Sequence, residues 1–415
     1  MVGQRLRFLL TTAEEHPTYR ADVRVLFGKY LPKFGIDTDL AAVVPMTGDV
    51  PPWGGGRLFP KPFKSNLGRM FAEIVQHLSL SWRCRQGYDG LIVRDKPIHG
   101  LIGLAAARMA GIPFVYWMSF PIPEMYLEIA RSPDESVRWR RRLYAWIRGQ
   151  AGSWALYRVL VPRVDHIFVQ SAVMLNELRG KGLSHARVTA VPMGIDIEAM
   201  PIPPHHDPGE SEGGTRRPSA VYLGTLSRLR RRELELMIDA AALVGESVPD
   251  FQLLVIGESD VEGEKGWLRR YAEDKGAAKW VRFVGWRPYD EGLALAGTCS
   301  IGLSPFPRGE LHESASPTKA IEYLALGLPI VCNDQPDQAQ VVRESGAGIC
   351  VPLTAAAFGS AIEKLLDEPE RARAMGRTGQ AWVRANRNYS GLAALVAHTL
   401  RSLKHRGQGS RDAAI

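Results

Sequence analysis

Two side chains of opposite charge, Lys319 and Glu322, stand three residues apart in a short segment whose apolar pattern predicts a helix. Ser316, Pro317 and Thr318 precede them, and we expect Ser316 to cap the helix and Pro317 to open it. A helix start presents free N–H groups and a positive dipole end, which suit a diphosphate. Lys319 would add a cation, and the Glu322 carboxylate can accept hydrogen bonds from a ribose diol. Taken alone, the pattern fits either a nucleoside diphosphate site or a surface helix with an ordinary Lys–Glu pair.

The elements that would position this helix alternate along the chain. Short runs rich in β-branched residues predict strands, and longer amphipathic runs between many of them predict helices. Since this alternation is typical of parallel sheets covered by helices, we expect an α/β protein. The predicted strands cover residues 6–10, 90–94, 113–118, 166–171, 187–193, 219–224, 251–257, 280–285, 299–306, 328–333 and 347–353.

The chain of 415 residues is too long for one ordinary core, so we expect two domains. Residues 201–217 are rich in proline, glycine and charge and lack a periodic pattern, which is typical of a linker. We therefore expect one α/β domain at 1–200 and another at 218–380. Residues 381–415 predict a helical tail that could pack back onto the first domain.

Composition narrows the class of protein. Hydrophobic content of 45% and charged content of 23% are typical of a soluble globular protein. No apolar run is long enough for a transmembrane helix, and the N-terminal segment predicts a strand rather than a secretory signal. The cysteines form no CxxC pair, which argues against a zinc site or a disulfide framework and favours a reducing cytoplasm. They are Cys84, Cys299, Cys332 and Cys350.

The segment 136–164 is strongly basic and contains no acidic residue, and tryptophans and tyrosines interleave its arginines. Leu143, Trp146 and Ile147 fall at helical spacing. A basic amphipathic helix of this kind suits an anionic membrane surface or a lipid-linked diphosphate. The alternative is a helix whose aromatic side chains pack on their own domain. No motif for nucleic-acid binding accompanies the patch, so we expect no nucleic-acid partner.

Residues 316–331, SPTKAIEYLALGLPIV, resemble the donor-site signature of retaining glycosyltransferases of family 4, which have the GT-B fold. In that family two glutamates stand eight residues apart, and an Ala-x-Gly-x-Pro turn follows. Glu322 matches the second glutamate, but the first position, near the reaction centre, falls on Ser314. Either Ser314 fills that catalytic position or a one-residue shift of the loop brings in Glu313.

The resemblance extends to other donor-binding positions. In the family, a turn that begins with glycine binds the diphosphate, and Gly224 begins the corresponding turn. The arginines after Gly224 either bind the phosphates or are solvent-exposed side chains without a ligand. Gly257 would let backbone approach the ligand. Trp286 either stacks on the base or is a buried structural residue. The candidate arginines are Arg228, Arg230 and Arg232.

The first domain carries weaker signals. Ser119 falls near the position where many relatives have a catalytic histidine, and His16 and His99 are candidates by residue type only. The resemblance implies two Rossmann-like domains with parallel sheets facing a central cleft, the first binding the acceptor and the second the donor. It also implies retention of anomeric configuration. Since no Asp-x-Asp motif follows a strand in the expected way, we expect no bound metal and no obligatory cofactor.

The sequence thus predicts a bacterial enzyme that transfers a sugar from a nucleoside diphosphate sugar to a lipid-linked or surface-polysaccharide intermediate. We expect it in the cytoplasm, at the inner face of the membrane. One alternative is a nucleotide-sugar epimerase on a GT-B-like fold. Another is a non-catalytic binding protein of this fold, which the missing first glutamate motivates. A Rossmann dehydrogenase is disfavoured because no GxGxxG follows the first predicted strand.

Overall fold

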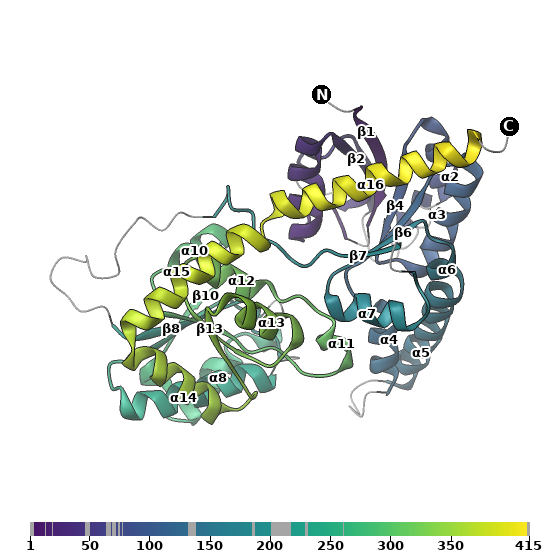
Figure 1. Ribbon diagram of the computed structural model, residues 1–415. Coiled ribbons are helices and arrows are strands. Elements are labelled where there is room, and N and C mark those ends of the chain that lie inside the picture. The colour runs from purple at the N-terminus through teal and green to yellow at the C-terminus, as the bar shows by residue number, and fades with distance from the viewer. Residues whose placement is uncertain are drawn as a thin grey trace. The chain divides into compact units, whose positions relative to one another are not determined.

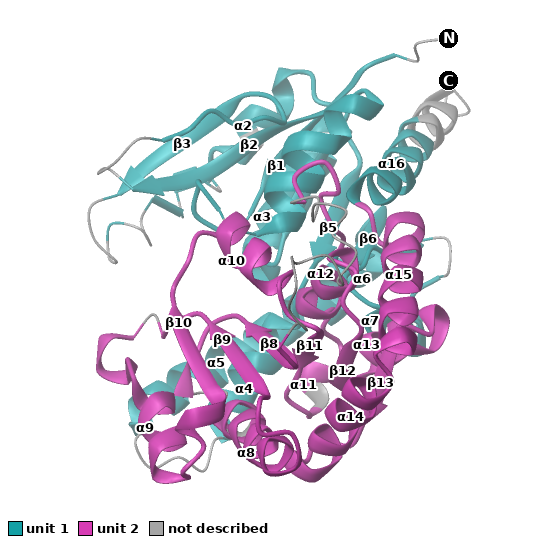
Figure 2. Ribbon diagram, turned by 90° about the vertical axis from the view of Figure 1, so that its left-hand side faces the viewer, with its two compact units in different colours: residues 1–193, 389–415 teal, residues 194–388 magenta. Residues whose placement is uncertain are grey.

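The computed structural model divides the chain into two compact units, and each is described by itself. Unit 1 comprises residues 1–193 and 389–415, and unit 2 comprises residues 194–388 (Figure 2). The structure describes residues 4–12, 14–18, 20–45, 50–63, 68, 72–73, 75–76, 78–131, 138–184, 187–200, 217–228, 231–259 and 261–412.

Unit 1 contains a parallel sheet whose described strands follow the order β3-β2-β1-β4-β5-β6-β7 (Figure 1). The strands are β1 (Leu6–Thr11), β2 (Ile36–Pro45), β3 (Leu58–Phe63), β4 (Gly90–Arg94), β5 (Phe114–Met118), β6 (His166–Val169) and β7 (Val188–Ala190). The helices include α2 (Leu80–Arg83), α3 (Pro97–Ala110), α4 (Ile122–Arg131), α5 (Trp139–Ser153), α6 (Val161–Arg163), α7 (Ala172–Gly180) and α16 (Tyr389–Asp412). Shorter helical segments lie at Asp22–Tyr30, Leu31–Phe34, Cys84–Gln86 and Trp154–Leu160.

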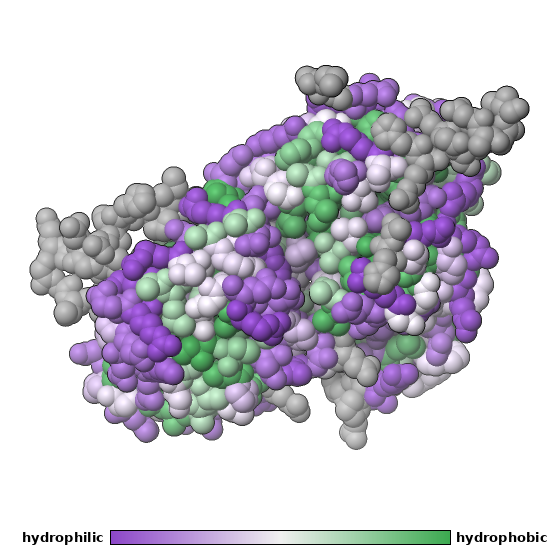
Figure 3. Space-filling model, in the orientation of Figure 1, coloured by the Kyte–Doolittle hydropathy of each residue, from purple (hydrophilic) through white to green (hydrophobic). Residues whose placement is uncertain are grey.

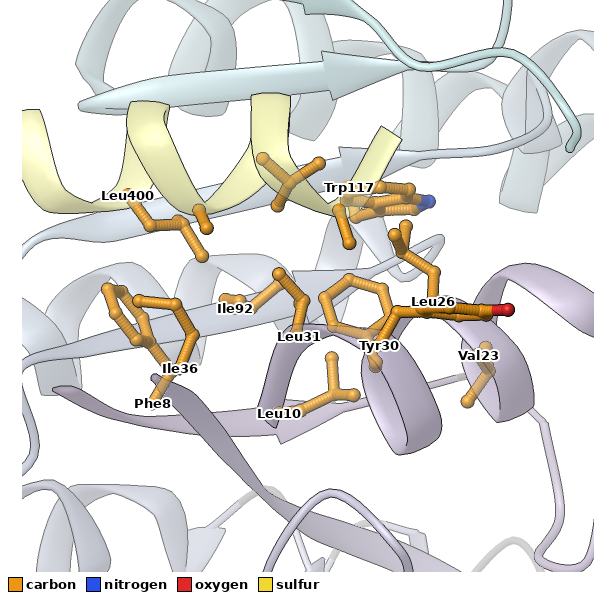
Figure 4. Close-up of a cluster of buried hydrophobic side chains, with 14 of the residues drawn as sticks. Phe8, Leu10, Val23, Leu26, Tyr30, Leu31, Ile36, Ile92, Trp117 and Leu400 are labelled. Carbon is orange, nitrogen blue, oxygen red and sulfur yellow. The ribbon is translucent and has the colours of Figure 1, made fainter. Parts of the chain in front are cut away.

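Side chains of β1 alternate between two buried clusters. Phe8 and Leu10 face one cluster, whereas Leu9 between them faces the other. The first cluster also contains Trp117 from β5 and Leu400 from α16 (Figure 4). Because both faces are covered, the strands are apolar almost throughout, as the sequence predicts.

Unit 2 has the same architecture with a parallel sheet in the order β10-β9-β8-β11-β12-β13. Its strands are β8 (Ser219–Leu223), β9 (Gln252–Ile256), β10 (Val281–Gly285), β11 (Ile301–Ser304), β12 (Ile330–Asn333) and β13 (Gly348–Val351). Its helices include α8 (Arg231–Ser247), α9 (Trp267–Asp274), α10 (Tyr289–Ala296), α11 (Glu310–Glu313), α12 (Thr318–Ala325), α13 (Pro336–Ser345), α14 (Ala355–Asp367) and α15 (Pro369–Asn386). Short helical segments lie at Glu262–Glu264 and Ala278–Trp280.

The predicted α/β class with parallel sheets is confirmed, but the sequence analysis missed two strands, β2 and β3. Strand β2 reads IDTDLAAVVP, and its aspartates and alanines are poor in strand propensity. Strand β3 reads LFPKPF and contains two prolines, which a strand tolerates because it lies at the end of the sheet. Burial of β2 on both faces outweighs its weak propensity.

The boundary between the units falls after Met193, and the predicted linker residues 201–216 lie outside the described residues. The predicted tail is split at residue 388, since α15 belongs to unit 2 and α16 to unit 1. Figure 3 shows hydrophilic side chains over much of the visible surface, with smaller hydrophobic patches between them. In the described part of the chain, no helix has the length and apolar character to cross a membrane.

Candidate functional site

Two glycines end neighbouring strands of unit 2, next to the point where its strand order reverses between β8 and β11. Ligands of such sheets bind at the carboxyl ends of the strands near this reversal. Gly224 follows β8, and Gly257 follows β9 with a φ of +141°. A methyl group on Gly257 would lie 1.9 Å from the carbonyl oxygen of Gly224, so the two backbones touch. This end of the sheet is therefore bare backbone, as the resemblance implies for a phosphate-binding turn.

Helix α12 brings Lys319 to this glycine pair. The buried hydroxyl of Tyr323 accepts a hydrogen bond of 2.7 Å from the backbone N–H of Leu223, which fastens the helix to the end of β8. Lys319 lies one turn earlier on the same helix. A methyl group on Gly224 would lie 2.6 Å from Lys319 Cε and 3.0 Å from its Nζ. The ammonium group therefore lies at the carboxyl end of β8.

The start of α12 differs from the predicted cap. Pro317, not Ser316, is the N-cap residue, and no side chain caps the helix there. The buried hydroxyl of Ser316 instead donates a hydrogen bond of 2.8 Å to the carboxylate of Asp337, which also pairs with Arg387 at 2.6 Å. The hydroxyl makes a charge-assisted hydrogen bond to this carboxylate and does not cap the helix. The first N–H groups of α12 are thereby left without a side-chain cap, a condition that suits an anionic ligand.

Glu322 is half-buried, and its Oε1 accepts a hydrogen bond of 2.8 Å from the hydroxyl of Tyr289. Burial raises the pKa of Glu322, although the Tyr289 hydroxyl and the Lys319 charge act in the opposite direction. Trp286, three residues before Tyr289, is 68% exposed. The alternative that Trp286 is a buried structural residue is therefore wrong, and an aromatic face is available to a ligand beside this carboxylate-bearing helix.

The loop between α11 and α12 holds the two candidates for the first motif position. Ser314 is buried, and its hydroxyl donates to the carbonyl of Leu311 at 3.1 Å. Glu313 is partly exposed and forms an ion pair of 3.1 Å with Arg308. The buried amide of Gln335 donates to the carbonyl of Ala315 at 2.9 Å and holds this loop in place. The loop thus presents a carboxylate through Glu313, while Ser314 turns inward.

The structure describes only some of the arginines that are predicted to bind the diphosphate. Arg228 is exposed, and its backbone N–H donates to the carboxylate of Glu264 at 3.0 Å. Arg230 lies outside the described residues, and for Arg232 the structure describes the backbone of α8 only. Their role in phosphate binding remains a prediction.

In unit 1, charged residues follow β4, the strand that holds the place of β11 in the strand order. Arg94, at the end of β4, is 1% exposed and pairs with Asp22 at 2.9 Å, with Asp95 at 2.9 Å and with Glu14 at 3.2 Å. Burial disfavours its charge, but the neighbouring carboxylates raise the pKa of Arg94. Ser119 is buried and donates both its hydroxyl and its backbone N–H to Asp95. Ser119 is therefore tied to this network through Asp95, and its catalytic role stays a prediction.

The two candidate histidines have different surroundings. His16 is buried, and its Nε2 lies 2.8 Å from the carbonyl oxygen of Pro51. His99 lies in the first turn of α3 and lines a cavity of unit 1. Burial, helped by the nearby charge of Lys96, lowers the pKa of His99 to about 4, so its imidazole is neutral near pH 7. Only His99 of the two lines this cavity.

The basic segment forms α5 and the turn after it, and six of its large side chains are exposed. This exposure argues against the alternative that these side chains pack on their own domain, except at Tyr144, which contacts Tyr126 and Arg148. The exposed side chains are Trp139, Leu143, Tyr144, Trp146, Ile147 and Trp154, with exposures from 48% to 68%. Among the described residues, no group of three or more His, Cys, Asp or Glu side chains could hold a metal ion.

Sequence analysis missed three residues that organise the donor region. Tyr323 fastens α12 to β8, Tyr289 contacts Glu322, and Gln335 holds the α11–α12 loop. Tyr323 carries a usable signal, because it follows Lys319 at helical spacing inside the signature. The other two lie in different segments of the chain and become neighbours only through the fold.

Two family descriptions match the chain. The model described as "Glycosyl transferases group 1" matches residues 211–382, and that described as "Glycosyltransferase Family 4" matches residues 7–199. The two matches together cover most of the chain. The chain belongs to this family of glycosyltransferases.

Individual relatives are distant. A glycogen synthase of Mycobacterium tuberculosis (strain H37Rv) is 25% identical over 254 residues, which cover 59% of this chain and 56% of that protein. A GDP-mannose-dependent monoacylated alpha-(1-6)-phosphatidylinositol monomannoside mannosyltransferase of Corynebacterium glutamicum is 24% identical over 260 residues, 60% of this chain and 66% of that protein. The chain thus spans less than two thirds of the length of these relatives.

Solved structures share the fold. A sucrose-phosphate synthase from Thermosynechococcus elongatus superimposes with a TM-score of 0.70 at 18% identity, over 96% of this chain and 99% of that one. HepE of Anabaena in complex with UDP-glucose gives a TM-score of 0.66 at 14% identity, over 95% and 99%. The fold is GT-B.

Proposed function

We propose that this chain is a retaining glycosyltransferase that moves a sugar from a nucleoside diphosphate sugar to a lipid-linked or surface-polysaccharide intermediate. The observation that carries this proposal is the position of the Lys319 ammonium against Gly224, at the strand ends of unit 2. Family membership supports the transferase class, and retention is the finer expectation of the resemblance.

The diphosphate would lie over the glycine pair and the start of α12. There the leaving group gains negative charge as the bond to the sugar breaks, so cations placed in advance stabilise the transition state. Lys319 supplies a charge, and the uncapped N–H groups of α12 supply donors. Arg228 can add a guanidinium from the exposed turn. No metal is required in this proposal.

The nucleoside would lie between Glu322 and the exposed aromatic side chains after β10. The Glu322 carboxylate accepts a hydrogen bond from the hydroxyl of Tyr289, and a carboxylate oxygen can accept more than one such bond. A ribose hydroxyl can join or replace that donor, while Trp286 offers a face for the base. UDP-glucose, bound by HepE, and GDP-mannose, named for the corynebacterial relative, are the first donors to test.

We place the acceptor side at an anionic membrane, at the inner face of the cytoplasmic membrane. The exposed tryptophans of α5 and the arginines between them support this placement, since such side chains favour a lipid–water interface. The phosphatidylinositol mannoside named for the corynebacterial relative is a lipid acceptor of the same class.

The test is a thermal-shift and binding series with UDP-, GDP-, ADP- and TDP-sugars on the full chain. One donor should raise the melting temperature, and Lys319→Ala and Glu322→Ala should each weaken its binding by roughly 10–100-fold, the effect of losing one hydrogen bond to a charged group. Lys364→Ala, an exposed lysine on α14, is the matched control and should change nothing. Unchanged binding in both site variants would remove the donor-site assignment. The anomer of the product, determined by NMR, then tests retention.

A second candidate is a protein that binds nucleotide sugars without transferring them. The inward-turned Ser314, in place of the family's first glutamate, favours this possibility. Glu313→Gln tests whether the Glu313 carboxylate takes part in transfer or whether the site only binds the donor. If Glu313 lies at the reaction centre, the variant should keep donor binding and lose transfer. If no acceptor supports transfer by the unmodified chain that binds donor, the binding role is correct.

A further inference from the structure

A cavity of about 440 Å³ lies in unit 1, where the first turns of α3 and α4 meet one face of α5. It opens beside the carboxyl ends of β4 and β5, since Asp95 and Lys96 after β4 and Ile122 after β5 line it. Ligands of parallel sheets bind at such ends. All of the residues that line the cavity in the described part of the chain belong to unit 1.

The charges in the cavity favour an anion. Lys96 is 9% exposed and pairs with Glu73 at 3.3 Å, so these two charges offset each other. Arg148 contacts two tyrosines, and the carboxylate of Glu73 also acts on its charge. Its guanidinium donates to the hydroxyl of Tyr144 at 2.7 Å and lies 5.0 Å from the ring centre of Tyr126. Such a planar cation, held between aromatic rings at a cavity wall, suits a phosphate group.

Glu73 acts on both Lys96 and Arg148, so the two cations of the cavity share this carboxylate. The other carboxylate in the cavity lining, Asp95, is engaged by Arg94 and by Ser119. Burial raises its pKa, against the effect of Arg94 and the hydrogen bonds from Ser119. His99 is neutral near pH 7, as described above. The cavity therefore combines two cations that share one carboxylate with apolar side chains such as those of Ile98 and Met125.

Helix α5 joins this cavity to the exposed aromatic surface. Tyr144, Arg148 and Gly152 are spaced by four residues and share the face that lines the cavity. Trp139, Leu143 and Trp146, at the same kind of spacing, occupy the adjacent exposed face.

Glycines allow α5 to pack closely on α4. A methyl group on Gly149 would lie 2.7 Å from the side chain of Leu127, and one on Gly152 would lie 3.4 Å from Pro123. The cavity wall is therefore a fixed helix pair that presents a charged pocket and an apolar surface side by side.

We propose that this cavity binds the phosphate-bearing head group of a lipid-linked acceptor, with Arg148 contacting the phosphate and the exposed face of α5 contacting the hydrocarbon chain. The proposal rests on the proposed function, whose acceptor class it specifies. An amphiphile with both parts should bind more tightly than either part alone, because the two faces belong to one rigid helix.

The experiment measures binding of geranyl diphosphate to the full chain by calorimetry, with inorganic pyrophosphate and geraniol as the single-part probes. Geranyl diphosphate should bind at least tenfold more tightly than either. Arg148→Gln should weaken it by about tenfold or more, the effect of losing a charged hydrogen-bonding partner. Arg108→Gln, which removes an exposed arginine of α3 that pairs with Asp165, is the control and should stay within about twofold.

A diphosphate could also bind at Lys319, so Lys319→Ala is included. Binding that survives Lys319→Ala and fails in Arg148→Gln supports the cavity. Binding that fails in Lys319→Ala and survives in Arg148→Gln overturns it, as does equal binding of pyrophosphate. Nucleotide-sugar binding, measured on the same samples, reports separately on the transferase proposal. If it is absent while geranyl diphosphate binds through Arg148, the transferase proposal fails and the cavity assignment stands.

Discussion

The two units share the order of their first six strands but have different residues at the carboxyl ends of those strands. In unit 2 the strand ends are glycines whose backbones touch, and Lys319 lies against them. In unit 1 the strand on the other side of the reversal, β4, ends in Arg94 and Asp95, which are buried in a network of carboxylates. A bare backbone with a cation leaves room for a diphosphate, whereas a filled network leaves the neighbouring cavity at α3 to α5 as the place for a ligand. A few residues after the strands therefore decide which kind of ligand each unit can bind.

The largest effect that this comparison predicts is on the network of unit 1. Arg94→Met should destabilise unit 1 by about 3–5 kcal/mol, because it leaves carboxylates buried without their cation. Denaturant unfolding measures the change. Arg5→Met, which breaks an exposed ion pair with Asp37 in the same unit, is the control and should cost less than about 1 kcal/mol. Equal losses would mean that the buried network is no more important than a surface pair.

The next effect concerns the bare backbone of unit 2. Gly257→Ala should destabilise unit 2 by about 2–3 kcal/mol and abolish nucleotide-sugar binding, because its methyl group would overlap the Gly224 carbonyl at an unfavourable φ. Gly263→Ala places a methyl group where no atom lies within 4 Å and should be neutral within about 0.5 kcal/mol. Thermal unfolding and donor titration measure both variants. If the two variants behave alike, the close backbone contact is not required.

The smallest effect is a pH dependence in unit 1. The pKa of His99 is lowered from 6.5 to about 4, so between these values the unfolded chain binds more protons than the folded chain. Stability from this group is complete above about pH 6.5 and is lost as pH falls toward 4, by about 1–2 kcal/mol for a partly solvent-exposed side chain. His99→Gln should flatten this slope in unfolding experiments between pH 7 and 4.5. His398→Gln, an exposed histidine on α16, should leave the slope unchanged.

Most strands and helices could be predicted from the periodicity of apolar residues, and the elements that were missed have physical causes. Strands such as β4 and β5 are recognisable in the sequence as nearly continuous apolar runs, because both of their faces are buried. Strand β2 does not, because its aspartates and alanines are stabilised by tertiary burial rather than by propensity. The cap at Ser316 was predicted wrongly because a local preference lost to the carboxylate of Asp337, which comes from a distant helix.

The candidate site divides in the same way. Lys319 and Glu322 were predictable because their spacing is local, and the structure places them on one helix at the strand ends. Tyr289 was not assigned a role, because its partner Glu322 comes from another segment of the chain. The placement of Lys319 and Glu322 leaves their roles as proposals that the donor titrations will test.

Helix α16 has a consequence for how the molecule is made. Tyr389, Val396 and Leu400 are fully buried in the core of unit 1, yet all of unit 2 lies between them and residue 193 in the sequence. A ribosome therefore delivers the sheet of unit 1 long before the helix that covers one of its faces. Until residue 400 emerges, Phe8, Leu10 and Trp117 lack part of their apolar cover, and unit 2 can fold first although its sequence comes second.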